Sequence, residues 1–310
     1  LHLLSRRQRQ MCIRDRCIIH PQLVYVTPNS CGGAFYKDFV VVQLLKIIRQ
    51  KVVVHYHNKG VAIHQNQFLD NWLYRIFFKN LKVILLAEAL YSDIQKYVPY
   101  NKVYICPNGI PKTIQTEPIS KKNNTIPRLL FLSNLLKSKG VLVLLDAYSI
   151  LKKKGYSFIG EFVGGETAEI NAVCFKEEIE KRNLNNIVKY EGKKYGKEKL
   201  TYFEKADIFI FPTFYETFGL VLLEAMEHAL PCISTNEGGI PNIIENGKTG
   251  YIVQKHSPKE IATKIEYLIK HPELRITMGK AGKDKFEKEF TLDKFENRMK
   301  DILKDCLASI

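Results

Sequence analysis

The 310-residue chain lacks any run of about 18 apolar residues, the length that a membrane-spanning helix requires. Its seven cysteines are scattered and include no C-x-x-C pair, which argues against a disulfide framework and a zinc site. Acidic residues are few, because 32 Asp and Glu face 47 Lys and Arg and leave a formal net charge of +15. We therefore expect a cytoplasmic protein in a reducing compartment, with an acidic partner or surface.

Two kinds of binding signature are also missing. No recognition helix or RNA-binding motif accompanies the positive charge, so we do not expect a nucleic-acid partner. No Asp-x-Asp occurs in the chain. His55 and His57 would point to the same side of a strand, but a third metal ligand is not evident. We expect no metal and no cofactor, and a metal held by the two histidines is the weaker alternative.

The hydrophobic content of 45% is ample for the cores of two domains. From Pro21 onward, short β-rich segments alternate with amphipathic stretches, a pattern typical of parallel α/β units. In the first half, strands are predicted at 23–28, 51–57, 83–87 and 102–110, and helices at a stretch ending near Gln50 and at 68–79. In the second half, strands are predicted at 128–133, 158–165, 187–192, 207–212 and 231–235, and helices include 139–154 and 219–229.

Four segments divide the chain. Residues 1–16 carry five arginines without periodicity and resemble translated adapter sequence, so we expect a non-native extension, with a genuine basic arm as the alternative. Residues 17–118 form a Rossmann-like domain that is incomplete, since a doubly wound domain usually takes about 150 residues. The polar segment 119–127 predicts a linker, so a second Rossmann-like domain occupies 119–288. A C-terminal helix is expected at 289–310, and one option is that this helix crosses back to the first domain.

Segment 206–253 concentrates the chemical features. A buried strand ends at Pro212, Glu216 lies in the turn after it, and Gly219 opens a helix that carries Glu224. Free amides at such a helix start form an anion site, aided by the helix dipole. On one continuous helix the two glutamates would lie about 12 Å apart, which exceeds the roughly 5 to 9.5 Å of a glycosidase carboxylate pair. Separate roles therefore fit better, and a loop residue plus a solvated helix residue is the structural alternative.

This segment resembles the E-x7-E region of the retaining family 4 glycosyltransferases. Four other segments stand in the order and spacing of that family, namely PNGIP (107–111), SNLLKSKGV (133–141), FVGG (162–165) and EGGIP (237–241). The resemblance covers about Pro21 to Leu303. It implies an α/β protein of GT-B architecture with two Rossmann-like, doubly wound domains. A nucleotide sugar would be held mainly by the second domain and the acceptor approached from the first.

The resemblance also implies roles for individual residues. Glu216 would bond hydroxyls of the donor sugar, Glu224 would accept the ribose hydroxyls, and Lys139 would neutralise the diphosphate leaving group. The family usually has an arginine where this chain has Asn134, so the leaving group would rely more on Lys139 and the helix start. The amides of Phe218, Gly219 and Leu220 would receive the diphosphate, and the implied donor site comprises Asn134, Lys139, Glu216, Thr217, Phe218, Gly219, Leu220 and Glu224.

Three further residues complete the implied site. His57 resembles the family histidine that closes the reaction centre, and with Lys139 and Glu216 it forms the implied catalytic set. Gly238 and Gly239 would let a backbone loop approach the donor sugar or the acceptor. Lys139 as an ordinary surface lysine and His57 as a hydrogen-bonded structural histidine are the alternatives. A phosphate loop at 32–33 is less favoured than an ordinary turn.

The implied function is transfer of a hexosyl unit, with retention, from a UDP- or GDP-linked sugar to a surface-glycan or lipid-linked acceptor. Retention would proceed by front-face attack through an oxocarbenium-like state. The alternative is a catalytically incomplete, nucleotide-sugar-binding fragment, because the family carries further β/α units before the segment that matches Leu23. An epimerase of similar fold has no positive signal.

A peripheral contact with the inner face of a membrane is a further expectation. Many enzymes that this chain resembles act on lipid-linked acceptors at an anionic leaflet. The stretch 68–82 could touch such a leaflet, or could equally be a core helix of the first domain. Its candidate contact residues are Trp72, Arg75, Phe77, Phe78, Lys79 and Lys82.

Overall fold

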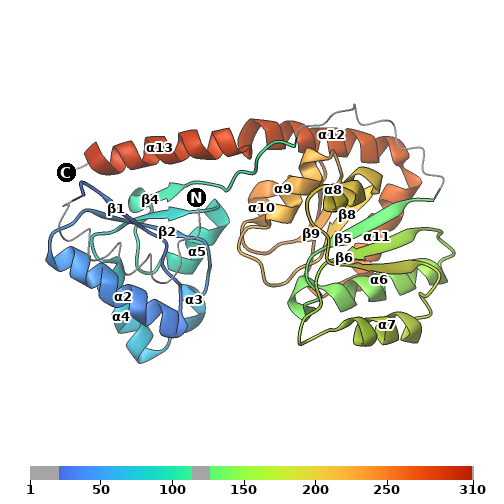
Figure 1. Ribbon diagram of the computed structural model, residues 1–310, viewed down its shortest axis with the longest axis horizontal. Coiled ribbons are helices and arrows are strands. Elements are labelled where there is room, and N and C mark those ends of the chain that lie inside the picture. Colours follow the sequence, from blue (N-terminus) through green and yellow to red (C-terminus); the bar gives the residue numbers. More distant parts are fainter. Residues whose placement is uncertain (1–20, 114–125, 309–310) are drawn as a thin grey trace. The chain divides into compact units, whose positions relative to one another are not determined.

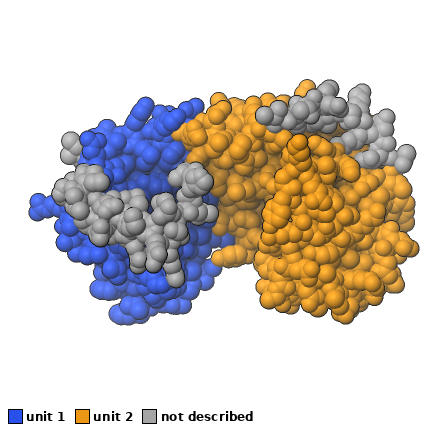
Figure 2. All heavy atoms as spheres, in the orientation of Figure 1, with its two compact units in different colours: residues 1–86, 90–106, 297–310 blue, residues 87–89, 107–296 orange. Residues whose placement is uncertain are grey.

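The computed structural model describes residues 21–113 and 126–308, which divide into two compact units (Figure 2). Unit 1 takes the described residues up to Leu86, Leu90–Cys106 and those from Asn297 onward. Unit 2 takes Ala87–Ala89 and the described residues of Pro107–Glu296. The extension predicted at 1–16 and most of the linker predicted at 119–127 lie outside the described residues.

Unit 1 is built around a four-stranded parallel sheet of order β1-β2-β3-β4 (Figure 1). Because the order advances in one direction, right-handed crossovers place α2 and α4 on the same face. Between these helices and the sheet, the ring of Phe35 packs 5.4 Å from that of Phe77. The main elements are β1 (Val24–Val26), α2 (Gly32–Ile47), β2 (Val52–Tyr56), α3 (Val61–His64), α4 (Phe68–Phe78), β3 (Lys82–Leu85), α5 (Tyr91–Ile94) and β4 (Val103–Ile105).

Unit 2 is a six-stranded parallel sheet of order β10-β9-β8-β5-β6-β7. From β5 the chain winds outward to β7, then returns to β8 and winds the other way, so the doubly wound prediction is confirmed for this unit. The elements are β5 (Arg128–Leu132), η3 (Lys137–Lys139), α6 (Val141–Lys153), β6 (Ile159–Val163), α7 (Ala172–Lys181), β7 (Val188–Gly192), α8 (Gly196–Lys205), β8 (Ile208–Phe211), α9 (Leu220–Glu227), β9 (Cys232–Thr235), α10 (Ile240–Ile243), β10 (Gly250–Val253), α11 (Pro258–Lys270) and α12 (Pro272–Glu289). Strand β10 was not among the predicted strands.

The helix predicted at 139–154 is two elements. Gly140, with a left-handed φ of 77°, separates η3 from α6. Lys139 is therefore the last residue of the short 3-10 helix η3 and is not part of α6. At the other end the predicted cap is confirmed, since Gly155 has φ 82° and the Tyr156 amide bonds the Leu151 carbonyl. The helix predicted at 219–229 likewise begins one residue later, because Gly219 is its N-cap with φ 98°.

Helix α4 confirms the helix predicted at 68–79 but divides its candidate membrane residues. Phe77 and Phe78 are buried in unit 1, so for these two residues the core alternative is confirmed. Trp72 is 54% exposed.

Gly32 and Gly33 open α2. Helix α13 (Leu292–Ala308) begins in unit 2, and its residues from Asn297 belong to unit 1. No helix within 21–113 or 126–308 is both long and apolar enough to cross a bilayer.

Candidate functional site

The site lies where unit 2 reverses its winding, at the carboxyl ends of β5 and β8. These parallel strands are hydrogen-bonded neighbours, with Leu130 opposite Phe209. After β5 the chain continues to β6 on one side of the pair, whereas after β8 it continues to β9 on the other side. In open parallel sheets, ligands bind in the crevice at such a switch point. Segment 133–140 follows β5 and segment 212–219 follows β8, and these two loops carry Lys139 and Glu216.

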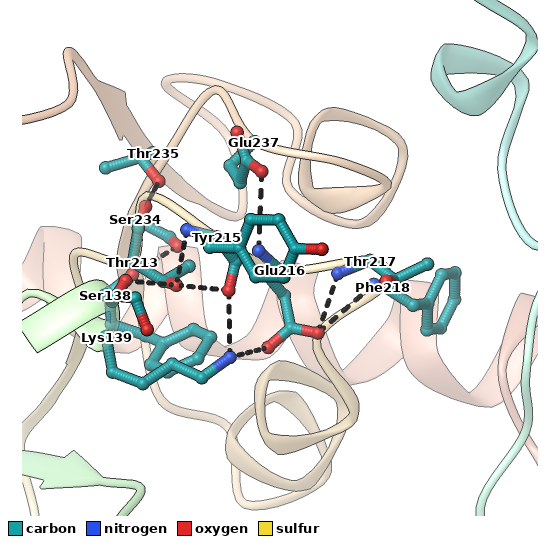
Figure 3. Close-up of polar contacts among 11 residues, drawn as sticks. Ser138, Lys139, Thr213, Tyr215, Glu216, Thr217, Phe218, Ser234, Thr235 and Glu237 are labelled. Atoms are coloured by element: carbon teal, nitrogen blue, oxygen red, sulfur yellow. Dashed lines mark hydrogen bonds and ion pairs between the residues drawn. The ribbon is translucent and has the colours of Figure 1, made fainter. Parts of the chain in front are cut away.

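A close backbone approach fixes the two loops against each other. At Gly140 a Cβ atom would lie 2.1 Å from the Pro212 carbonyl oxygen, so only glycine fits here. The Phe214 amide donates to the Ser138 carbonyl oxygen at 2.9 Å. The hydroxyl of buried Thr213 lies 3.1 Å from the same carbonyl oxygen (Figure 3). Lys139 is thereby held beside the segment that carries Glu216.

Lys139 and Glu216 form an ion pair beyond the ends of these two strands, with Nζ 2.9 Å from Oε2 (Figure 3). Lys139 Nζ also donates to the Tyr215 carbonyl at 3.0 Å. The two side chains are 19% and 21% exposed, so solvent reaches both. A polar ligand can therefore reach this pair.

The second oxygen of Glu216 faces backbone amides at the approach to α9. Its Oε1 accepts from the Thr217 amide at 2.9 Å and from the Phe218 amide at 3.4 Å. Gly219 and Leu220 follow at the helix start. Gly219 is the N-cap of α9 and, being glycine, has no side chain that could cap the helix amides. The Glu216 carboxylate thus occupies amides that could bind a phosphate, one of which, Phe218, was predicted to do so.

Glu224 lies one turn into α9 and is bound by another cation. Lys199 of α8 places its Nζ 2.6 Å from Glu224 Oε1, with both side chains about one quarter exposed, at 25% and 26%. The sequence prediction missed Lys199, because its pairing depends on how α8 and α9 pack. Glu216 and Glu224 therefore have separate cationic partners, Lys139 and Lys199.

Asn134 is exposed and organises the loops after β5 and β6. Its Oδ1 accepts from the Gly165 amide at 3.1 Å. Next to it, a Cβ on Gly164 would lie 1.8 Å from the Ser133 carbonyl oxygen. The SNLLKSKGV and FVGG segments noted in the sequence therefore meet in space. In contrast, Gly109 of PNGIP packs against the Thr291 backbone, with 2.3 Å from a built Cβ to its oxygen.

Gly238 and Gly239 make their close approaches to the Glu216 segment. A Cβ on Gly238 would lie 2.3 Å from the Glu216 carbonyl oxygen, and the Gly239 amide donates to the Thr217 carbonyl at 2.8 Å. Glu237, which precedes them and was missed, is buried and paired with Lys255. Its place at the head of EGGIP was the available signal.

His57 lies in unit 1, directly after β2, whereas the other predicted site residues lie in unit 2. Its ring is 4.1 Å from that of fully buried His55, whose Nδ1 lies 2.7 Å from the Tyr25 hydroxyl. Burial lowers the pKa of His55 to about 3, with the neighbouring His57 adding to the effect. Partial burial also lowers the pKa of His57, which favours the neutral imidazole. Within the described ranges, no three His, Cys, Asp or Glu side chains form a metal-binding cluster.

Unit 2 is a parallel α/β sheet with a cation and helix-start amides at its switch point. These features are typical of nucleotide-binding folds. Residues 113–285, more than half of the chain, match the family model of the Glycosyl transferases group 1, and the chain belongs to that family.

Individual relatives agree with this assignment. The capsular polysaccharide biosynthesis glycosyltransferase CapM of Staphylococcus aureus is 29% identical over 222 residues, 67% of this chain and 57% of CapM. The chain thus spans little more than half the length of that relative. Anabaena Alr3699/HepE in complex with UDP superposes with a TM-score of 0.80 at 20% identity, over 96% of this chain and 81% of HepE. A glycosyltransferase of Rickettsia africae gives 0.78 at 18% identity, over 100% of this chain and 85% of that structure. These structures share the two-domain GT-B fold expected from the sequence.

Proposed function

We propose that the chain belongs to a retaining, family 4 glycosyltransferase that moves a hexosyl unit from a UDP- or GDP-linked sugar to a surface-glycan or lipid-linked acceptor. One observation carries the proposal. Lys139 and Glu216, from the loops after β5 and β8, converge beside the amides that lead into α9. A cation and helix-start amides suit a diphosphate, and a carboxylate beside them suits sugar hydroxyls.

In the proposed reaction each residue has one task. Lys139 and the α9 start neutralise the diphosphate as it leaves, Glu216 orients the sugar, and Glu224 accepts the ribose hydroxyls. His57, held neutral by its lowered pKa, closes the reaction centre from the acceptor side. The acceptor attacks the face from which the diphosphate departs. Names of relatives support the acceptor class, since CapM acts in capsular polysaccharide biosynthesis.

A second candidate is a nucleotide-sugar-binding fragment without transfer activity. It is favoured by one observation, that the chain spans 57% of CapM. All predicted donor residues lie in unit 2, whose sheet has six strands against four in unit 1. Donor binding with no turnover would identify the fragment, and turnover at ordinary rates would exclude it.

The test combines calorimetry with UDP, GDP, UDP-glucose and GDP-mannose and a nucleotide-release assay with a membrane extract as the acceptor source. We expect Lys139→Ala and Glu216→Ala each to raise the Kd for the sugar nucleotide about tenfold or more. The matched controls are Lys154→Ala and Glu266→Ala, which break a 2.7 Å ion pair elsewhere in unit 2. If the first two variants bind all four ligands like the parent chain, the assigned roles are wrong.

We further propose that the exposed side of α4 makes the peripheral membrane contact. Phe68 and Trp72 are 90% and 54% exposed on this helix, while Leu73 and Tyr74 belong to the core. The exposed Arg75 and Lys79 add positive charge. Phe68→Ser with Trp72→Ser should abolish co-sedimentation with phosphatidylglycerol vesicles. Ile276→Ser, at a 66% exposed apolar position in unit 2, should not. Equal binding by both variants would refute the contact.

A further inference from the structure

The loop after β9 holds the backbone on both sides of Glu216, and Figure 3 shows the contact from Glu237. Glu237 Oε1 accepts from the Glu216 amide at 3.4 Å. Two residues on, the Gly239 amide donates to the Thr217 carbonyl at 2.8 Å. Between them Gly238, at φ 52°, lies so close that a Cβ would be 2.3 Å from the Glu216 carbonyl oxygen. Three consecutive residues therefore fix the peptide units from which the Glu216 side chain projects.

Glu237 is unusual among these contacts because it brings a charge into the interior. Its side chain is only 4% exposed, and it pairs with Lys255, which is 39% exposed. A buried carboxylate without such a partner is strongly unfavourable. The pair leaves one Glu237 oxygen directed at the Glu216 amide while Lys255 binds the other. The charge thus maintains a hydrogen-bond acceptor at a place that solvent hardly reaches.

The segment that supplies Lys255 also contacts the loop after β8 at a second point. His256, in a left-handed conformation with φ 57°, places its ring 4.1 Å from that of Phe214. Phe214 precedes Glu216 by two residues, and its amide is bonded to Ser138. Loops after β5, β9 and β10 therefore all converge on the short segment between Thr213 and Phe218. Such support is what a precisely oriented ligand-binding carboxylate requires.

We propose that Glu237 is a positioning residue that orients Glu216 toward the sugar end of the donor, and that Lys255 keeps Glu237 in place. This inference rests on the proposed function of Glu216. It goes beyond it in assigning roles to two residues that touch neither phosphate nor sugar. Because Glu237 acts through Glu216, its loss should weaken recognition of the hexosyl group. Recognition of the nucleoside diphosphate, which rests on Lys139, Glu224 and the α9 start, should be spared.

The experiment measures Kd by calorimetry for UDP and UDP-glucose, and for GDP and GDP-mannose, on the complete 310-residue chain. The readout is the ratio of the nucleotide Kd to the sugar-nucleotide Kd. Glu237→Ala should lower this ratio about tenfold, the value of one hydrogen-bond contact, while the nucleotide Kd itself changes by less than about twofold. Glu237→Gln should lower the ratio less than Glu237→Ala, because its single amide oxygen can still accept from the Glu216 amide although the ion pair with Lys255 is lost.

Two further variants guard against a purely structural effect. Lys255→Met should also lower the ratio, whereas Lys255→Arg should keep the parent ratio. These two variants preserve the test if Glu237→Ala fails to fold. The matched control is Glu161→Ala, because Glu161 is a 3% exposed carboxylate paired with Arg128 in the same unit. Arg128 begins β5 at the end of the sheet opposite the loops that carry Lys139 and Glu216. Glu161→Ala should leave the ratio unchanged in the folded fraction.

Each outcome supports or overturns the positioning role. A ratio that stays within about twofold of the parent in Glu237→Ala overturns it, since one hydrogen bond should produce a larger change. The role is equally overturned if Glu161→Ala lowers the ratio by the same factor, or if Glu237→Gln behaves like Glu237→Ala. Failure of the parent chain to bind any of the four ligands is a different result, which overturns the proposed function itself.

Discussion

Lys139 and Glu216 bind each other, with 2.9 Å between Nζ and Oε2. The proposed function assigns them to opposite ends of one donor, the lysine to the diphosphate and the glutamate to the sugar. Glu216 also accepts the amides of Thr217 and Phe218. Its carboxylate therefore occupies contacts that a phosphate would use. Under the proposed function, a donor would have to displace these contacts, and this would release Glu216 toward the sugar.

The first prediction follows from this competition. Glu216→Gln removes the negative charge that competes with phosphate for Lys139, so free UDP or GDP should bind about three- to fivefold more tightly. The sugar nucleotide should bind more weakly, because the amide is a poorer acceptor for sugar hydroxyls. Calorimetry with both ligands measures the two changes. Lys139→Met is the control, and it should weaken both. Unchanged or weaker binding of the free nucleotide by Glu216→Gln would contradict the displacement.

Glu224 provides the second prediction, which concerns the ribose. If Glu224 accepts the ribose hydroxyls, Glu224→Ala should abolish any preference for UDP over 2′-deoxy-UDP, worth about tenfold for one charged hydrogen bond. Lys199→Met removes the ion-pair partner at 2.6 Å but leaves the carboxylate, so it should retain the preference. A Glu224→Ala chain that still discriminates the two nucleotides would show that the ribose is bound elsewhere.

Much of the fold was predictable because its signals are local. Buried strands such as β8 are continuous apolar segments, and Gly155 marks the end of α6 through its left-handed φ of 82°. Strand β10 was missed, because only the four-residue helix α10 precedes GYIV and no long helix marks the N-terminal side of this strand. The break at Gly140 was also missed, since its cause is the distant Pro212 carbonyl.

The candidate site was less predictable because its contacts join loops that are far apart in the sequence. Lys139 and Glu216 are 77 positions apart, and only the order of β5 and β8 in the sheet brings them together. Their individual roles followed from a resemblance, but their mutual ion pair did not. The EGGIP segment pointed to Glu237, but its burial and its pairing with Lys255 had no signal, because a buried acidic residue cannot be distinguished from an exposed one by its letter.

The third prediction tests the close approach at Gly140. Gly140→Ala combines a left-handed φ of 77° with a Cβ 2.1 Å from the Pro212 carbonyl oxygen, so the two loops must separate. Gly155→Ala is the matched control, with φ 82° and no atom within 4 Å. The control should lose about 1 kcal/mol of unfolding free energy from the backbone conformation alone. Gly140→Ala should lose about 3 kcal/mol or more, together with nucleotide binding. Equal losses in urea unfolding would show that the loops are not in contact.

The fourth prediction concerns the pH dependence of unit 1. His55 is fully buried, and burial lowers its pKa to about 3 from 6.5 in the unfolded chain. Below pH 6.5 the unfolded chain takes up a proton that the folded chain refuses, so stability is present above this pH and is lost as the pH falls toward 3. Between pH 7 and pH 5 the loss from His55 should be about 2 kcal/mol.

The chain offers a direct readout, because its single tryptophan, Trp72, lies in α4 of unit 1. Urea unfolding followed by Trp72 fluorescence at pH 7 and pH 5 gives the free energy of unfolding of this unit. His55→Gln keeps a hydrogen-bonding side chain for the Tyr25 hydroxyl, whose own pKa is raised to about 12 by burial, and it cannot titrate. The variant should therefore lose about 2 kcal/mol less than the parent over the same interval. Parallel losses in the two proteins would mean that His55 is protonated as easily in the folded chain as in the unfolded one.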